Sequence, residues 1–117
     1  MQTKKIVWLG DSRENVRQFP DEIKQSIGHA LFKVQAGKVP SNAKSLKSFK
    51  PSVMEIKANF DTNTYRAIYT VKLGEELYVL HCFQKKSKQG KKTAKQDIDL
   101  IKQRLREAEQ LSKTKSN

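Results

Sequence analysis

The residues of this chain that could carry out chemistry are a carboxylate, an arginine and several lysines, spread over three short apolar stretches. Glu55 and Lys57 lie two positions apart, so they share one face of an extended strand. Arg66 lies within the next apolar stretch, and the pair Lys85–Lys86 ends the third. If these stretches are neighbouring strands, we expect the charged side chains to meet at one end or face of one sheet.

This set of side chains is suited to work on a phosphodiester. Arginine and lysine can hold a phosphate and stabilise the charge that develops when it is attacked. A carboxylate or a lysine of lowered pKa could take a proton from a sugar hydroxyl, and His81 is within reach of the same edge. These groups suffice for metal-independent RNA cleavage, in which the RNA's own 2′-hydroxyl attacks the adjacent phosphate and positioning matters more than a special nucleophile.

Each candidate also has an ordinary structural interpretation. Glu55 and Lys57 could form a solvent-facing strand pair, and Arg66 could form an ion pair with Glu55 across the strands. His81 lies in an apolar strand, where a histidine is more often a hydrogen-bonded core residue than a catalyst. We expect neither a metal nor a cofactor, since the sequence contains no zinc-ligand spacing, phosphate-binding glycine loop or nucleophile elbow.

Composition limits the class of partner. The chain has 117 residues and a formal net charge of +12, which fits a single domain and favours a nucleic acid, an anionic membrane surface or an acidic protein as partner. Lysines that follow the third apolar stretch are expected to attract RNA without sequence preference. They are Lys88, Lys91, Lys92 and Lys95.

Membrane insertion and secretion are not indicated. No window approaches the length of a transmembrane helix, and the apolar run near the N-terminus is too short for a signal peptide. The single cysteine, Cys82, excludes a disulfide framework. We therefore expect a cytoplasmic protein that does not contact a membrane, folded as one domain over residues 1–117 with a frayed polar end at 112–117.

The patterns of the segments that position these residues predict an α+β fold with the order strand, helix, helix, three strands, helix. The strands are expected at residues 4–9, 53–60, 64–73 and 77–83. The last three, joined by short turns, form an antiparallel meander, and the first strand joins it to hide an edge. The segment 38–52, with Pro40 and Pro51 near its ends, is interpreted as a polar connection without regular structure.

The expected helices are a hairpin before the meander and a single helix after it. Asp11-x-x-Glu14 resembles a capping box for a short helix, and Pro20 fits the first turn of the next helix. Thr93-x-x-Gln96 resembles a capping box for the C-terminal helix. Apolar residues at helical spacing give the inward stripes: Ile23, Ile27, Ala30, Leu31 and Val34 in the second helix, and Ala94, Ile98, Ile101, Leu105 and Ala108 in the last.

At the strand meander the sequence resembles the RelE/ParE superfamily of bacterial toxins and, within it, the phage-derived HigB-like group. The matching features are MEIK at 54–57, YRAIY at 65–69 and VLHCFQKKSK at 79–88, together with the order of the elements. The resemblance implies the toxin of a type II toxin–antitoxin system, a ribosome-dependent mRNA endonuclease that inhibits translation. It also implies a neutralising antitoxin, typically a small helix-turn-helix protein in HigB-like systems.

The resemblance assigns roles by position. Arg66 matches the family's central-strand arginine, expected to bind the scissile phosphate. Lys57 matches a strand lysine that transfers protons or binds phosphate in the RelE branch. Lys85 matches a basic residue just after the last strand, and Lys86 belongs to the F-x-K-K motif of the HigB-like group. Glu55 takes a position that is lysine in the RelE branch, which leaves the general base unassigned.

Two other functions are compatible with the same features. A ParE-like protein would share the fold but poison DNA gyrase, with no dependence on Lys57 or Arg66. A non-catalytic basic module would bind RNA or ribosomes with a steep salt dependence and cut nothing.

Overall fold

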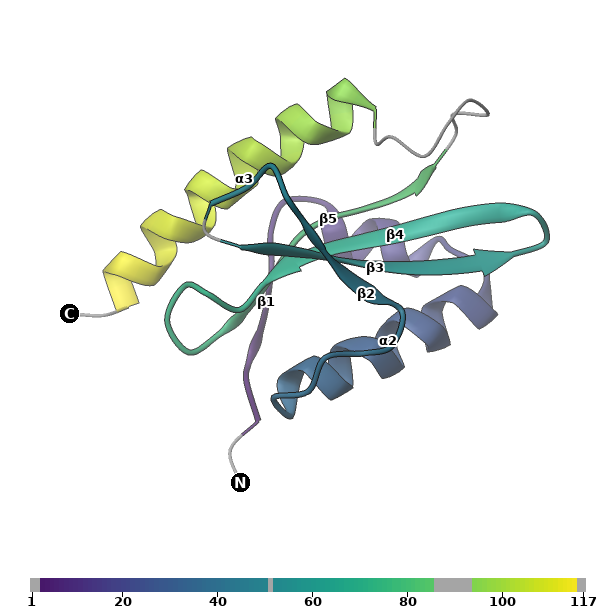
Figure 1. Cartoon of the computed structure of the whole chain (residues 1–117), viewed down its shortest axis with the longest axis horizontal. Coiled ribbons are helices and arrows are strands. Elements are labelled where there is room, and N and C mark those ends of the chain that lie inside the picture. Colours follow the sequence, from purple (N-terminus) through teal and green to yellow (C-terminus); the bar gives the residue numbers. More distant parts are fainter. Residues whose placement is uncertain (1–2, 51, 86–93, 116–117) are drawn as a thin grey trace.

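A computed structural model describes residues 3–50, 52–85 and 94–115 of the chain, except for the side chain of residue 115. One five-stranded sheet has the order β1-β5-β4-β3-β2 (Figure 1). The strands are β1 (Ile6–Trp8), β2 (Ala43–Leu46), β3 (Val53–Phe60), β4 (Asn63–Thr70) and β5 (Leu77–Lys85). The helices are α1 (Ser12–Arg17), α2 (Asp21–Gln35) and α3 (Lys95–Lys115). The α+β prediction, with two helices before the meander and one after it, is confirmed.

The sheet is mostly but not wholly antiparallel. Strands β3, β4 and β5 form the expected antiparallel meander, whereas β1 pairs with β5 in parallel. A parallel neighbour needs a long crossover connection, and the chain supplies one because both α1 and α2 lie between β1 and the meander. The first strand therefore joins the sheet at the edge formed by β5, as predicted, and runs in the same direction as β5.

Strand β2 corrects the prediction that segment 38–52 has no regular structure. It pairs antiparallel with β3, and Lys44 lies opposite Glu55. Pro40 lies outside the four residues of β2, so its ring removes no hydrogen bond from the ladder, and Pro51 lies outside the described residues. None of the four residues of β2 is fully buried, so the strand carries little apolar pattern in the sequence.

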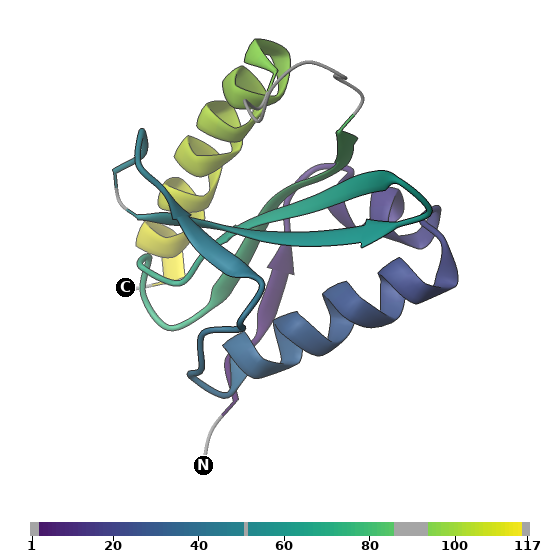
Figure 2. The same cartoon turned by 45° about the vertical axis from the view of Figure 1, so that its right-hand side comes forward.

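The two faces of the sheet are covered by different helices (Figure 2). On one face α2 contributes its predicted stripe, all of it buried against β3, β4 and β5. On the other face α3 contributes Ile101, Leu105 and Ala108, with Ile98 partly buried beside them, while Ala94 is exposed and precedes the helix. The helix continues through Lys115.

A β-bulge in β5 determines which residues face α3. Ile68 pairs with His81 but the next residue, Tyr69, pairs with Val79, so Leu80 has no partner in β4. Leu80 packs in the core on the α3 face, and His81 also bonds to α3. Strict alternation along β5 would place Val79 and His81 on the same face, but Val79 packs in the core on the α2 face while His81 bonds to α3.

The helix starts differ from the expected capping boxes. Asp11 occupies the cap position of α1 but its side chain makes no capping hydrogen bond; it accepts one from Arg104 of α3 instead. Pro20 is the cap residue of α2 rather than part of its first turn. Thr93 lies outside the described residues, so the third capping box stays a prediction.

Candidate functional site

Strand register brings four of the predicted site residues to one end of the α3 face. Lys57 lies opposite Arg66, and Thr64, two residues before Arg66, lies opposite Lys85. Val53, Glu55 and Lys57 lie two positions apart along β3 and therefore share one face of the sheet. Val53 packs in the core beneath α3, so this is the α3 face. In both overall views the tip of the β3–β4 hairpin extends beyond α3 (Figures 1 and 2).

The remaining predicted cations are not placed with this group. Lys86, Lys88, Lys91 and Lys92 lie outside the described residues, so their roles stay predictions. Lys95 is the first residue of α3 and is exposed.

A buried ion pair lies at the centre of the site. Oε2 of Glu55 is 2.5 Å from Nη1 of Arg66, and the two side chains are 0% and 5% exposed. The contact lacks the alignment of a hydrogen bond, and neither carboxylate oxygen of Glu55 nor Nε of Arg66 has a hydrogen-bond partner. Arg66 therefore forms the ion pair with Glu55 across the strands that its structural interpretation predicts.

Three lysines surround this pair. Lys57 is exposed, Lys85 is half-buried at the end of β5, and Lys44 of β2 places Nζ 3.9 Å from Oε1 of Glu55. Lys44 was missed in the sequence because β2 was not predicted. A signal was present in the spacing of Lys44 and Leu46, which lie two positions apart and so share a face of a strand. Leu46 packs against Val53, and this places Lys44 opposite Glu55.

The electrostatics of the group act on Lys85. Desolvation lowers the pKa of this ammonium, and the charges of Arg66 and Lys57, with a smaller contribution from Lys44, lower it further. Glu55 opposes them by raising it. Because a lysine of lowered pKa holds more neutral amine at a given pH, Lys85 is the member of the group best suited to accept a proton.

His81 belongs to a separate buried cluster. Its Nε2 is 2.9 Å from Oδ1 of Asp97, its Nδ1 is 3.4 Å from Nη1 of Arg104, and its ring stacks on Phe83 at 4.7 Å between centroids. Arginine can only donate, so Nδ1 accepts and the proton on Nε2 is donated to Asp97. These contacts are those of a hydrogen-bonded core histidine.

Arg104 and Asp97 are residues of this cluster that the sequence interpretation missed. The guanidinium of Arg104 donates to the carbonyl oxygen of Leu80 at 3.0 Å and to Oδ1 of Asp11 at 2.7 Å. It also fills the space beside Gly10, where an added Cβ would come within 2.6 Å of it, and Gly10 has φ +52°. A signal was present, since Arg104 lies on the inward stripe between Ile101 and Ala108.

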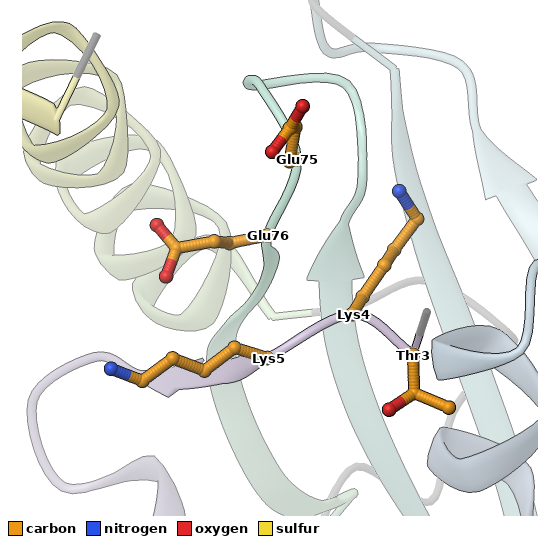
Figure 3. A pocket seen from close by; sticks show the side chains of 5 residues that line it. All are labelled: Thr3, Lys4, Lys5, Glu75 and Glu76. Carbon is orange, nitrogen blue, oxygen red and sulfur yellow. The ribbon is translucent and has the colours of Figure 1, made fainter. Parts of the chain in front are cut away.

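The described cavities lie away from the site. One of about 400 Å³ is lined by side chains of both signs at the start of β1 and the β4–β5 turn (Figure 3): Thr3, Lys4, Lys5, Glu75 and Glu76. Another, of about 300 Å³, has a mainly apolar lining that includes Val34, Met54 and Tyr69 on the α2 face. Neither contains a predicted site residue.

The part of the chain that the structure describes shows neither a metal site nor a membrane span. Within it no three His, Cys, Asp or Glu side chains are grouped so that they could hold a metal ion. No described helix has the length and apolar character needed to cross a membrane. Cys82 is buried, and burial raises the pKa of its thiol to about 12, so it is not a nucleophile at neutral pH.

Comparison with known proteins identifies the family. Neither the curated proteins nor the solved structures contain a match to this chain. Among protein families, the one described as Phage derived protein Gp49-like (DUF891) matches residues 14–106, a range that includes every predicted site residue. That family falls broadly within the RelE/HigB toxin group. The chain therefore belongs to the Gp49-like family of phage-derived proteins.

Proposed function

We propose that this protein is the toxin of a type II toxin–antitoxin system, and that it cleaves mRNA on the ribosome without a metal ion. Its membership of the Gp49-like family supports the toxin role. The observation that carries the chemistry is the convergence of Lys44, Lys57 and Lys85 around a buried ion pair at one end of the sheet.

In the proposed reaction Lys85 takes the proton from the 2′-hydroxyl of the RNA, because its lowered pKa leaves more of its amine neutral at a given pH than in an ordinary lysine. The 2′-oxygen forms a bond to the adjacent phosphorus while the bond from phosphorus to the 5′-oxygen breaks. The exposed ammonium of Lys57 donates a proton to that leaving oxygen, and Lys44 binds a non-bridging oxygen. The products are a 2′,3′-cyclic phosphate and a 5′-hydroxyl.

Glu55 is not the base in this proposal. Its side chain is completely buried and paired with Arg66, so it has no surface from which to reach a ribose hydroxyl. Because Glu55 replaces the lysine of the RelE branch and cannot act as the base, another lysine takes the proton in this proposal.

The proposed partners follow from the charge and the family. The net charge of +12 suits ribosomal RNA and mRNA, which attract basic surfaces over long range. It also suits an acidic antitoxin, for which a small helix-turn-helix protein is the proposed candidate.

Binding of RNA or ribosomes without cleavage is a second candidate, and the Glu55–Arg66 ion pair favours it. An arginine neutralised by a buried carboxylate offers less charge to a transition state than a free one. In that case the lysines would bind RNA with a steep salt dependence, and no cut ends would form.

Cell-free translation followed by primer extension tests the proposal. Wild-type protein should generate new 5′-ends on a translated mRNA in the presence of a metal chelator that leaves the ribosome intact, and the double variant Lys57→Ala/Lys85→Ala should not. The matched control is Lys72→Ala/Lys102→Ala, which removes two exposed lysines outside the site. Intact mRNA at doses of wild-type protein that stop translation would rule out cleavage.

A further inference from the structure

The feature that the proposed reaction does not use is the carboxylate of Glu55. It is completely buried among positive charges, with Arg66 on one side and Lys44 on the other. Burying a carboxylate is costly unless cations compensate for the lost hydration. Glu55 is therefore an anion already present in a cluster of cations that would otherwise bind an anion from solution.

The Glu55–Arg66 contact leaves hydrogen-bonding capacity unused. Arginine and a carboxylate commonly pair through two parallel hydrogen bonds. Here both carboxylate oxygens lack a hydrogen bond, and so does Nε of the guanidinium. A buried polar group without a hydrogen bond is costly, so a partner that supplied these hydrogen bonds would compete with the Glu55–Arg66 pair.

A phosphate is such a partner. It presents several acceptor oxygens to the guanidinium fork, and the exposed Lys57 lies directly opposite Arg66, where it would hold the same anion. We propose that Glu55 limits RNA affinity by acting as an internal competitor for Arg66, so that an RNA phosphate gains the arginine only by displacing this carboxylate. The inference rests on the proposed RNA-binding role of the same site.

The proposal gives Glu55 opposite effects on stability and on binding. Glu55→Gln keeps the shape of the side chain but leaves the buried charge of Arg66 unpaired, so the protein should melt at a lower temperature. The freed arginine should then add one charge-assisted contact to RNA, which tightens binding about tenfold. A residue with only a structural role would weaken both stability and binding.

The experiment measures binding of a fluorescent single-stranded 2′-O-methyl oligonucleotide, which lacks the attacking hydroxyl and cannot be cleaved by the proposed route. Glu55→Gln should tighten binding and make the slope of log affinity against log salt steeper by about 0.7, the value for one more contact to a single strand. The control Glu75→Gln makes the same change in net charge at the other end of β5, near the cavity of Figure 3, and should leave both quantities unchanged. Equal effects of the two variants, or weaker binding by Glu55→Gln, would overturn the proposal.

A second variant covers the case in which Glu55→Gln does not fold. Glu55→Gln/Arg66→Gln removes both charges together and leaves no buried ion unpaired. If Glu55 masks Arg66, this variant should bind the oligonucleotide as tightly as wild type. Weaker binding by the double variant would mean that Arg66 already contributes, and would refute the inference. Because the probe cannot be cut, these results are independent of the cleavage assay, and either proposal can fail without the other.

Discussion

Lys57 lies directly opposite Arg66 in the antiparallel register of β3 and β4, so two positive side chains are neighbours on one face of the sheet. Like charges in this arrangement repel each other. The structure relieves the repulsion because Arg66 pairs inward with the buried Glu55, while Lys57 stays exposed. Lys57 is therefore the cation of this pair that meets a substrate first.

Replacing Lys57 should distinguish the contribution of its positive charge to RNA binding from its contribution as a proton donor to cleavage. Lys57→Ala should lower the rate of mRNA cleavage by about 100-fold or more, the usual effect of removing a group that stabilises developing charge. Lys57→Arg should recover RNA binding but not the rate, because arginine does not give up a proton. Single-turnover cleavage and oligonucleotide binding measured on the same preparations give this comparison; a fully active Lys57→Arg would show that only charge is needed there.

The pH dependence of cleavage should report on Lys85. This lysine must be neutral to accept a proton, so the rate should rise as the pH approaches its pKa, which is lowered from the ordinary 10.5. Glu55 raises this pKa, so Glu55→Gln should move the rising limb to lower pH. Lys85→Arg should abolish the limb. A limb that keeps its position in Glu55→Gln would argue against Lys85 as the base.

Lys44 should contribute to RNA binding although no sequence pattern identified it. It is 66% exposed and reaches the site from the edge strand β2. Lys44→Gln should weaken oligonucleotide binding and flatten its salt slope by about 0.7, as expected for one lost phosphate contact. Lys47→Gln, an exposed lysine just beyond β2, is the matched control; the same loss in both variants would indicate only a general effect of net charge.

His81 and Arg104 should affect stability rather than cleavage. Arg104→Met should lower the free energy of unfolding by about 2 kcal/mol, because the buried carbonyl of Leu80 loses its donor. His81→Gln should also destabilise the protein, since the bond to Asp97 ties β5 to α3. Chemical denaturation gives the free energies, and cleavage per folded molecule should stay at the wild-type level. A stable but inactive His81→Gln would restore the histidine as a catalyst.

The parts of the fold that the sequence predicted well are those with a local period. The stripe from Ile23 to Val34 is buried as expected, and the meander register brings Lys57, Arg66 and Lys85 together. Both results depend on repeats of 3.6 or 2 residues within one element or between strands joined by short turns. The convergence of the cationic site could be predicted for that reason.

The parts that were missed depend on contacts between distant segments. Arg104 bonds to Asp11, 93 positions away, and this bond takes the carboxylate that the capping-box pattern assigned to α1. The bulge at Leu80 turns His81 toward α3, a change that strand alternation does not contain. Lys44 depends on a short edge strand whose ladder is made entirely with β3. Tertiary pairing decided each of these positions.

The Asp11–Arg104 bond should make stability depend on pH in acid. The hydrogen bond and charge of Arg104 hold the pKa of Asp11 below its ordinary 3.8. A carboxyl whose pKa is depressed in the folded state adds stability at pH values above its unfolded-state pKa, and that stability is lost as the pH falls through its folded-state pKa.

Because the Asp11 side chain is 59% exposed, solvent screening limits its contribution to about 1 kcal/mol or less. Asp11→Asn should therefore be less stable than wild type by urea denaturation at neutral pH, and the difference should shrink as the pH falls below 3.8, whereas Asp99→Asn, an exposed residue of α3, should match wild type throughout. A deficit in Asp11→Asn that persists unchanged into acid would mean that the charge of Asp11 is not what the bond to Arg104 uses.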